Sequence, residues 1–319
     1  MPPDDKAAPA YVGPAAANPL PSANAASHQN LSVAAALALV LNAFIWGVSW
    51  WPFRHLQGYG LHPLWSTAAL YLLVFGALLT VRFNSWRGFV HHPQLLLLAL
   101  AAGLTNVGFN WAVTVGDVVR VVLLFYLMPA WSVLIAWLLL DEKPSRASLL
   151  RLALAMTGVL IVLKTPDSPW PIPQGGADWL ALMGGLSFAV TNALLRKCRD
   201  TPSQSRMLAM FGGGGLLAAA AALLGMWQQL VPAPALQAAG IPMLLALSVA
   251  FMVSNAALQY GAAKLVASTT ALVMLTEILF ASASSVLLGA ATFTPRILLG
   301  GSLIVLAAVL AALSPAESH

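Results

Sequence analysis

Residues 117–163 read DVVRVVLLFYLMPAWSVLIAWLLLDEKPSRASLLRLALAMTGVLIVL and contain two apolar runs separated by the charged hinge Asp141-Glu142-Lys143-Pro144. Each run has about 20 residues, enough for an α-helix to cross a hydrocarbon core of roughly 30 Å. Because the hinge is short, the two helices are expected to be antiparallel neighbours. The stretch therefore predicts a helical hairpin in a membrane, and a similar pattern returns near residues 265–313.

The composition of the whole chain also indicates a membrane protein. The mean hydropathy is +0.82 and 8% of the residues are charged, whereas soluble domains have about 25% charged residues. The net charge of +5 does not indicate nucleic-acid binding, because the basic residues are scattered through short connections. Cys198 is the single cysteine, which excludes a disulfide framework and a thiolate metal site. No metal or cofactor is expected.

Ten apolar runs predict an all-α integral membrane protein with ten transmembrane helices. Helices fit better than barrel strands, because the runs are long and do not alternate between apolar and polar residues. The runs cover residues 31–53, 63–81, 93–114, 118–140, 147–164, 177–195, 206–227, 240–260, 266–289 and 295–313.

Polar and proline-rich segments divide the chain. Residues 1–30 are expected to form a disordered tail, and they lack the basic start and apolar core of a signal peptide. The loop TPDSPWPIPQGGAD at 165–178 separates two groups of five helices. We therefore expect a first repeat over 31–164, a linker over 165–176, a second repeat over 177–313 and a tail over 314–319.

Ten crossings place both termini on one side of the membrane. Cytoplasmic segments carry an excess of Lys and Arg, and most of these residues lie on the side of the N-terminus when the chain is threaded through ten helices. Both tails are therefore expected in the cytoplasm and the linker in the periplasm.

The two halves can be aligned with each other. Phe44 to Arg54 (FIWGVSWWPFR) aligns without gaps on Leu186 to Arg196 (LSFAVTNALLR), and Met128 to Asp141 aligns on Thr276 to Gly289. An odd number of helices in each half means that the second half enters from the opposite side. This arrangement predicts an inverted repeat, which many secondary transporters use to hold a substrate near the bilayer midplane.

The stretch VLLFYLMPAWSVLIAWLLLDEKPS, followed by LLRLALAMTGVLIVL, resembles the EamA-type repeat of the drug/metabolite transporter superfamily, and LLGAATFTPRILLGGSLIVLAAVL looks like the closing hairpin of a second copy. Within the superfamily, the chain looks most like YddG-type exporters of amino acids. The resemblance implies a ten-helix basket in a bacterial inner membrane, which exports metabolites or cationic drugs by alternating access. Two departures are the second hinge, Gly289-Ala290-Ala291, which lacks an acidic residue, and Glu277, which stands where the first copy has Pro129.

Glu277 is the sharpest candidate for a functional residue. It lies about eleven residues into the ninth run, near the bilayer centre, where a carboxylate is costly unless it is protonated, paired or facing a wet cavity. It could bind a substrate ammonium group or carry a proton. The structural alternative is a protonated carboxyl bonded to Thr276 or Ser282.

Further polar and aromatic side chains share helix faces and are expected to line the same cavity. Amides can bind charged substrate groups without buried charge, although polar side chains in membranes often only join helices. The large rings could wall the cavity or hold a cation, or belong to the interfacial belt of aromatic residues. The full set of expected cavity residues is Asn42, Trp46, Ser49, Trp50, Asn106, Asn110, Trp111, Tyr126, Met128, Asn192, Asn255, Gln259 and Glu277.

Two prolines are candidate hinges. Pro52 and Pro129 each remove an amide hydrogen from the interior of an apolar run, so each is expected to bend its helix. Proline is also common in membrane helices that have no moving part.

The function favoured by the sequence is export of small metabolites, most of all amino acids, with cationic drugs as further substrates and proton exchange as an open alternative. Another metabolite class, such as nucleotide-like or sugar compounds, is the runner-up, and import is open. An ATP-driven pump would need a glycine-rich phosphate loop, and an intramembrane zinc peptidase would need His-Glu-x-x-His; both motifs are absent. An intramembrane enzyme is a minor alternative, and the inverted repeat disfavours a channel.

Overall fold

The computed structural model describes residues 23–116, 118–164, 170, 172–290 and 294–313. Its described elements are all helical, and ten segments are long and apolar enough to cross a membrane. The elements are α1 (Ala23–Val48), α2 (Trp50–Gly58), α3 (Pro63–Val81), η1 (Phe83–Trp86), α4 (Arg87–His91), α5 (Gln94–Val115), α6 (Val118–Phe125), α7 (Met128–Leu140), α8 (Arg146–Leu163), α9 (Gly176–Lys197), α10 (Ser203–Trp227), η2 (Ala238–Gly240), α11 (Ile241–Lys264), α12 (Ala267–Met274), α13 (Glu277–Leu287) and α14 (Pro295–Ala312).

The ten spans follow the ten predicted runs closely. The second span, α3, has the predicted bounds. The largest difference is at the first, because α1 begins at Ala23 rather than at Leu31. The sequence ANAA at 23–26 contains good helix formers, so the helix extends before the apolar run begins. The rest of the predicted tail, residues 1–22, lies outside the described residues, as do most of the linker and the tail at 314–319.

Three spans are interrupted. The first is broken at Ser49, between α1 and α2, and the fourth at Tyr126 and Leu127, between α6 and α7. Proline lacks an amide hydrogen and clashes with the carbonyl four residues earlier. The helices before the two breaks end at Val48 and Phe125, four residues before Pro52 and Pro129. The predicted bends therefore lie one turn ahead of each proline.

The ninth span is broken within one residue of the position equivalent to the break in the fourth. Leu275 and Thr276 separate α12 from α13, although no proline follows, because Glu277 occupies the position aligned with Pro129. The two broken spans also end alike, since Asp141 after α7 has φ 55° and Gly289 has φ 70°. A left-handed residue commonly ends a helix, and glycine adopts this conformation without strain.

Helix packing follows a pattern that an inverted repeat produces. If each helix is replaced by its equivalent in the other half, the α5–α9 contact becomes the α11–α1 contact, and the α7–α9 contact becomes the α13–α1 contact. All four of these helix pairs are in contact. Two further contacts convert into themselves, namely α3 with α10 and α8 with α14.

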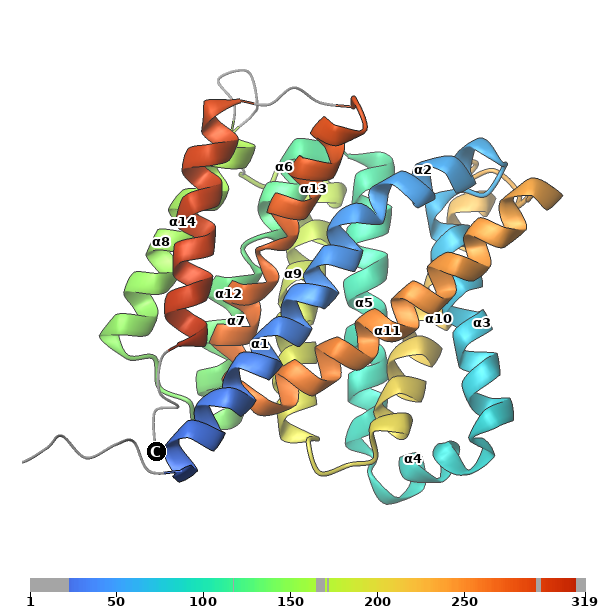
Figure 1. Ribbon diagram of the computed structural model, residues 1–319. Helices are drawn as coiled ribbons and strands as arrows, with labels where there is room; N and C mark the ends of the chain where they lie inside the picture. Colours follow the sequence, from blue (N-terminus) through green and yellow to red (C-terminus); the bar gives the residue numbers. More distant parts are fainter. Residues whose placement is uncertain (1–22, 117, 165–169, 171, 291–293, 314–319) are drawn as a thin grey trace, which may run out of the picture.

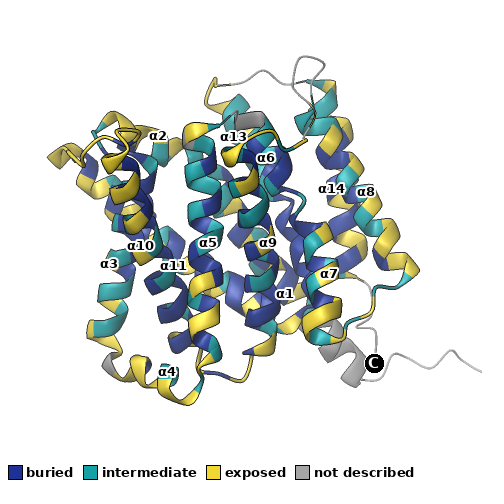
Figure 2. Cartoon of the chain, turned by 180° about the vertical axis from the view of Figure 1, so that it is seen from behind, coloured by how far each residue is buried: buried dark blue, intermediate teal, exposed yellow. Residues whose placement is uncertain are grey.

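Close packing depends on glycine at several of these contacts. A Cβ atom on Gly158 of α8 would lie 2.6 Å from the carbonyl oxygen of Gly300 on α14, and one on Gly300 would lie 2.6 Å from that of Gly158. Small residues of this kind let membrane helices approach through their backbones. Figure 2 shows the buried residues on the inner turns of α9, α10 and α11, with exposed residues concentrated on α2, α4 and the outer turns.

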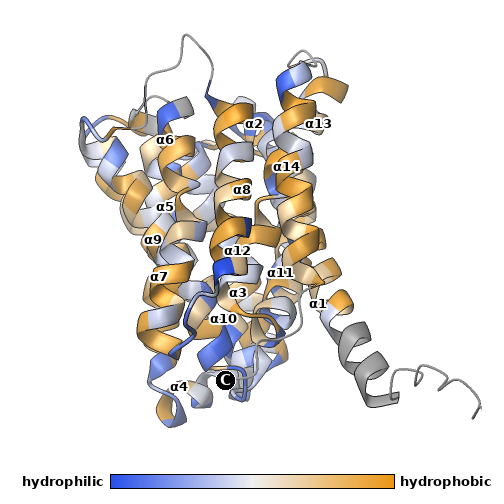
Figure 3. Ribbon diagram, turned by 90° about the vertical axis from the view of Figure 1, so that its left-hand side faces the viewer, coloured by the Kyte–Doolittle hydropathy of each residue, from blue (hydrophilic) through white to orange (hydrophobic). Residues whose placement is uncertain are grey.

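The two ends of the bundle are the polar ones. Figure 3 shows apolar residues along the middle of the helices and hydrophilic residues gathered toward both ends. In Figure 1, α1 begins and α14 ends at the same end of the bundle, which we call the terminal face. The opposite end carries α2 and the end of α13 and is called the distal face.

Candidate functional site

A central cavity lies among the spans that cross the middle of the bundle. Its volume is about 80 Å³, measured as the space open to the centres of water molecules. Its walls come from α1, α3, α5, α9, α10 and α11 and from the broken fourth and ninth spans, whereas α8 and α14 contribute no described lining residue. The cavity therefore lies between the two halves of the chain.

Glu277 and Tyr126 face each other across this cavity. Glu277 is the first residue of α13 and Tyr126 lies in the break between α6 and α7, so each broken span contributes one of them. The Tyr126 hydroxyl donates a hydrogen bond to the Glu277 carboxylate. Glu277 is the one carboxylate among the described residues of the lining, which include no Lys, Arg or His. A cation is therefore the charged group that this cavity can neutralise.

Four asparagines supply amide groups to the lining. The Asn106 Oδ1 atom accepts a hydrogen bond of 3.1 Å from the Tyr71 hydroxyl, and the Asn110 Nδ2 atom donates one of 2.9 Å to Thr67 Oγ1. Asn255 donates to the sulfur atom of Met210 at 3.4 Å. These contacts fix the amides in place on α5 and α11.

The side chain of Asn42 on α1 has a satisfied donor and an unsatisfied acceptor. Its Nδ2 atom donates to Ser254 on α11, at 2.9 Å to the carbonyl oxygen and 2.6 Å to the hydroxyl. Its Oδ1 atom is buried and has no hydrogen-bond partner in the described structure. A buried unsatisfied acceptor is costly, and Asn42 lines the cavity, so a bound ammonium or hydroxyl group could satisfy it.

Aromatic rings form two clusters on the walls. The centroid of the Trp46 ring lies 4.7 Å from that of Phe251, with the rings inclined by 59°, and the Tyr71 ring lies 6.1 Å from that of Phe251. On the other side, the Phe125 ring lies 4.8 Å from Phe109 and 6.3 Å from Phe188. The polar groups of the cavity are therefore flanked by two apolar, polarizable surfaces that suit an aromatic or aliphatic side chain.

The structure brings most of the expected cavity residues together. Those that line the cavity are Asn42, Trp46, Asn106, Asn110, Tyr126, Met128, Asn255 and Glu277. Five others lie elsewhere. Ser49 donates to the Trp46 carbonyl oxygen at 2.7 Å, Trp50 donates to Ser284 Oγ at 2.9 Å, and Trp111 packs against Leu64 and Val231. Gln259 donates a hydrogen bond of 2.7 Å from its Nε2 atom to Asn255 Oδ1. Asn192 is fully buried in α9.

Several lining residues were not expected from the sequence. Tyr71, Phe109, Phe125, Phe188 and Phe251 lie in apolar runs, where a ring gives no sign of whether it faces lipid or a cavity. The available signal was the spacing of Phe109 three residues after Asn106 and of Phe251 four residues before Asn255, because residues three or four apart share a helix face.

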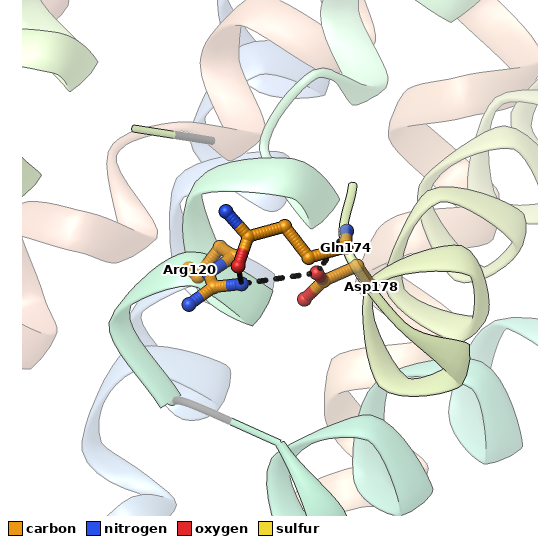
Figure 4. Close-up of polar contacts among 3 residues, drawn as sticks. All are labelled: Arg120, Gln174 and Asp178. Atoms are coloured by element: carbon orange, nitrogen blue, oxygen red, sulfur yellow. Dashed lines mark hydrogen bonds and ion pairs between the residues drawn. The ribbon is translucent and has the colours of Figure 1, made fainter. Parts of the chain in front are cut away.

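Ion pairs join α9 to other spans at both faces. Figure 4 shows the pair at the distal face: the Arg120 guanidinium of α6 lies 3.4 Å from Asp178 of α9 and 2.6 Å from Gln174. The carboxylate of Asp178 also accepts from the backbone amide of Gln174 at 2.8 Å. Asp117, three residues before Arg120 in the sequence, lies outside the described residues.

The pair at the terminal face involves the acidic hinge. Arg196, near the end of α9, forms an ion pair with Glu142 in the connection between α7 and α8. Arg196 also donates to the Leu265 carbonyl oxygen at 2.7 Å, and the second oxygen of Glu142 accepts from the amide of Ala267 at 3.4 Å. The hinge of the first half is thereby attached to the start of α12, the helix that leads to Glu277.

Comparisons with known proteins agree with this architecture. A solved structure titled "Crystal structure of protein" has a TM-score of 0.66 and 16% identity, covering 88% of this chain and 97% of its own, which shows a shared fold. "Uncharacterized transporter PA0485" of Pseudomonas aeruginosa is 26% identical over 160 residues, covering 48% of this chain and 51% of the relative.

"Protein RarD" of Streptomyces exfoliatus is 32% identical over 139 residues, covering 42% of this chain and 40% of the relative. The chain thus spans about half the length of the curated relatives it matches, or less. Residues 33–164, which form the first five spans and half of the cavity wall, match the EamA-like transporter family.

Proposed function

We propose that the whole chain is a secondary transporter of the EamA type, which exports small amphipathic metabolites by alternating access through the central cavity. Amino acids, including aromatic ones, are the favoured substrates, and cationic drugs are further candidates. In this proposal the protein lies in the bacterial inner membrane with both termini in the cytoplasm. The matched family and the transporter named among its relatives support the class of function.

The observation that carries the proposal is that the broken fourth and ninth spans meet at the cavity. Discontinuous helices place polar groups and helix ends at the membrane midplane in many transporters. Here each broken span presents one polar residue, Tyr126 or Glu277, and the two side chains are hydrogen-bonded. A substrate that separated them would contact both halves of the chain at once, so its binding would be coupled to their relative movement.

The chemistry of the lining matches an amphipathic amine. Its ammonium group would bind Glu277 and the free acceptor of Asn42, and its side chain would lie between the aromatic clusters. The substrate carboxylate of an amino acid would have amide donors as partners rather than a cationic side chain. The Trp46 ring offers a further cation-binding surface.

The test is uptake and counterflow with the purified protein in liposomes. We expect saturable flux that a trapped amino acid on the other side of the membrane stimulates, competed by other amino acids and by cationic dyes. Glu277→Gln should abolish most of the flux, whereas Asp200→Asn, which alters a fully exposed carboxylate, should leave it unchanged. Flux without saturation or counterflow would identify a channel and contradict the proposal. Unaltered transport by Glu277→Gln at every pH would remove Glu277 from the mechanism.

A further inference from the structure

A second cleft lies at the terminal face and shares no lining residue with the central cavity. It has about 100 Å³ open to the centres of water molecules. The connection between α7 and α8, the end of α9 and the connection between α11 and α12 all contribute to it. The proposed transport pathway assigns no task to this cleft.

The lining of the cleft is strongly cationic. It contains Lys143, Arg151, Arg196 and Lys264, with Glu142 as the one carboxylate among the described residues of the lining. Glu142 is already engaged by Arg196 and by the amide of Ala267. Because Glu142 is engaged by Arg196, Lys143 and Lys264 have no carboxylate partner among the described residues of the lining. An anion would neutralise their charges.

The backbone adds to this positive field. Both α8 and α12 begin at the cleft, and hydroxyl groups of their first turns belong to the lining, namely Ser148 and Thr269. The start of a helix carries partial positive charge and free amide groups, which makes it suited to anions. At the start of α8, the hydroxyl oxygen of Ser145 already accepts from the amide of Ser148 at 3.1 Å. At the start of α12, Glu142 accepts from the amide of Ala267, and the side chain of Val266 provides no cap to the other first-turn amides. Hydroxyls, amides and ammonium groups together are the donor set that a phosphoryl group requires.

The position of the cleft favours a ligand at the membrane surface. Ala311 and Ala312, the last residues of α14, form part of its wall together with Ser32 of α1, and Figure 1 places the end of α14 at the terminal face. Basic pockets between transmembrane helices at this depth bind the head groups of anionic lipids.

We propose that this cleft binds a phosphoryl anion, presented either by the head group of an anionic phospholipid or by a free phosphate. The two sources offer the same chemistry to Lys143 and Lys264. A bound anion would connect the α7–α8 hinge with the α11–α12 connection, next to the ion pair of Glu142 and Arg196. It would therefore stabilise the folded bundle at the terminal face, whatever the central cavity transports.

The test is thermal unfolding of the purified full-length protein in an uncharged detergent. The probes are a short-chain phosphatidylglycerol, a short-chain phosphatidylcholine and inorganic phosphate. A ligand of the native state raises the unfolding temperature in proportion to its occupancy. We expect phosphatidylglycerol or phosphate to raise Tm by about 2–4 °C, with a smaller rise at high salt, and we expect no rise with phosphatidylcholine.

Two double variants distinguish anion binding in the cleft from a general effect of positive charge on the surface. Lys143→Gln with Lys264→Gln should remove most of the rise. Arg82→Gln with Lys197→Gln removes two exposed charges of the same face outside the cleft and should retain it. A rise with phosphatidylglycerol alone assigns the site to lipid, and a rise with phosphate assigns it to the free ion. An equal rise with phosphatidylcholine, an equal loss in both double variants, or no rise with either anion would overturn the proposal. Because transport is not measured, each of these outcomes is independent of the proposed function.

Discussion

At the scale of single residues, the central cavity is the place where a few polar side chains of the apolar helices lie together. The sequence could identify Asn42, Tyr126 and Glu277, because a polar side chain inside an apolar run is conspicuous and costly. It could not identify Phe109 or Phe188, because a phenylalanine is equally at home against lipid and against a cavity. Which way such a ring faces is decided by helix crossings that the sequence does not encode locally.

Replacing Trp46 should weaken substrate binding. Trp46 lines the cavity and packs on Phe251, so Trp46→Ala removes both a wall and a cation-binding ring, the latter worth about 0.5–2 kcal/mol. We expect the half-saturation concentration for uptake into liposomes to rise roughly 3- to 30-fold. Trp51→Ala, which removes an exposed ring outside the cavity, is the control. Equal effects of the two substitutions would exclude a specific contribution from Trp46.

His62 should make stability depend on pH. Its side chain is buried at the start of α3 and accepts a hydrogen bond from the amide of Leu64 at 3.2 Å. Burial lowers the pKa of His62 from its ordinary value of 6.5, so the unfolded chain takes up the proton first. The stabilisation is complete above pH 6.5 and is lost as the pH falls toward the lowered pKa.

His62→Asn provides the comparison, because asparagine also caps helices but does not titrate. The unfolding temperature of the wild-type protein, measured relative to that of the variant, should fall below pH 6.5. A difference that stays constant between pH 8 and pH 5 would contradict this role.

At the scale of helices, apolar length was enough to place the spans, since crossing a bilayer imposes both length and apolarity. The breaks were harder to predict. Pro52 and Pro129 indicated two of them, but the break at Leu275 and Thr276 has no proline. It could be anticipated only from the alignment with the first half, in which Glu277 takes the place of Pro129.

Enlarging Gly158 should destabilise the contact between α8 and α14. The carbonyl oxygen of Gly300 would lie 2.6 Å from a Cβ atom at position 158, so Gly158→Leu forces two backbones apart at a cost of about 1–3 kcal/mol. Thermal unfolding in detergent should show a lower Tm. Gly76→Leu, at a position with open space around it, should leave Tm nearly unchanged, and an equal decrease there would show that bulk alone is responsible.

Removing one partner of the Glu142–Arg196 ion pair should also lower stability. The two side chains are 13% and 23% exposed, which places the pair between a surface pair and a buried one, so we expect Glu142→Gln to cost about 1–2 kcal/mol. The change would also loosen the start of α12. Asp200→Asn removes the carboxylate of an exposed pair and should have no measurable effect. Thermal unfolding of the two variants under the same conditions makes the comparison.

At the scale of the whole molecule, the exchange of the two halves explains which helices meet. The sequence predicted this architecture from the count of spans and from two short alignments, and the contacts of α1 with α11 and of α5 with α9 follow it. The position of the central cavity follows as well, because its described lining residues come from equivalent spans of both halves, all except α8 and α14.

The orientation in the membrane is a separate prediction. Reporter domains fused after residue 313 and before residue 23 should both be active in the cytoplasm. Cysteines placed at Gly289 and at Lys197 in a Cys198→Ser background should be labelled from opposite sides of the membrane, with the periplasmic reagent reaching position 289. Fusions that report opposite sides for the two ends would refute the ten-span threading.

The two hairpin turns at Asp141 and Gly289 share a backbone conformation, but only the first is followed by a carboxylate that engages a neighbouring span. Under the proposed function, this difference between the halves would give the outward and inward conformational changes different activation energies. For an uncoupled substrate, the final concentration ratio across the membrane would be unaffected by this difference. The half-saturation concentrations measured from the two sides would differ, however, because the acidic side chain of Glu142 is present at the hinge of one half and has no counterpart in the other.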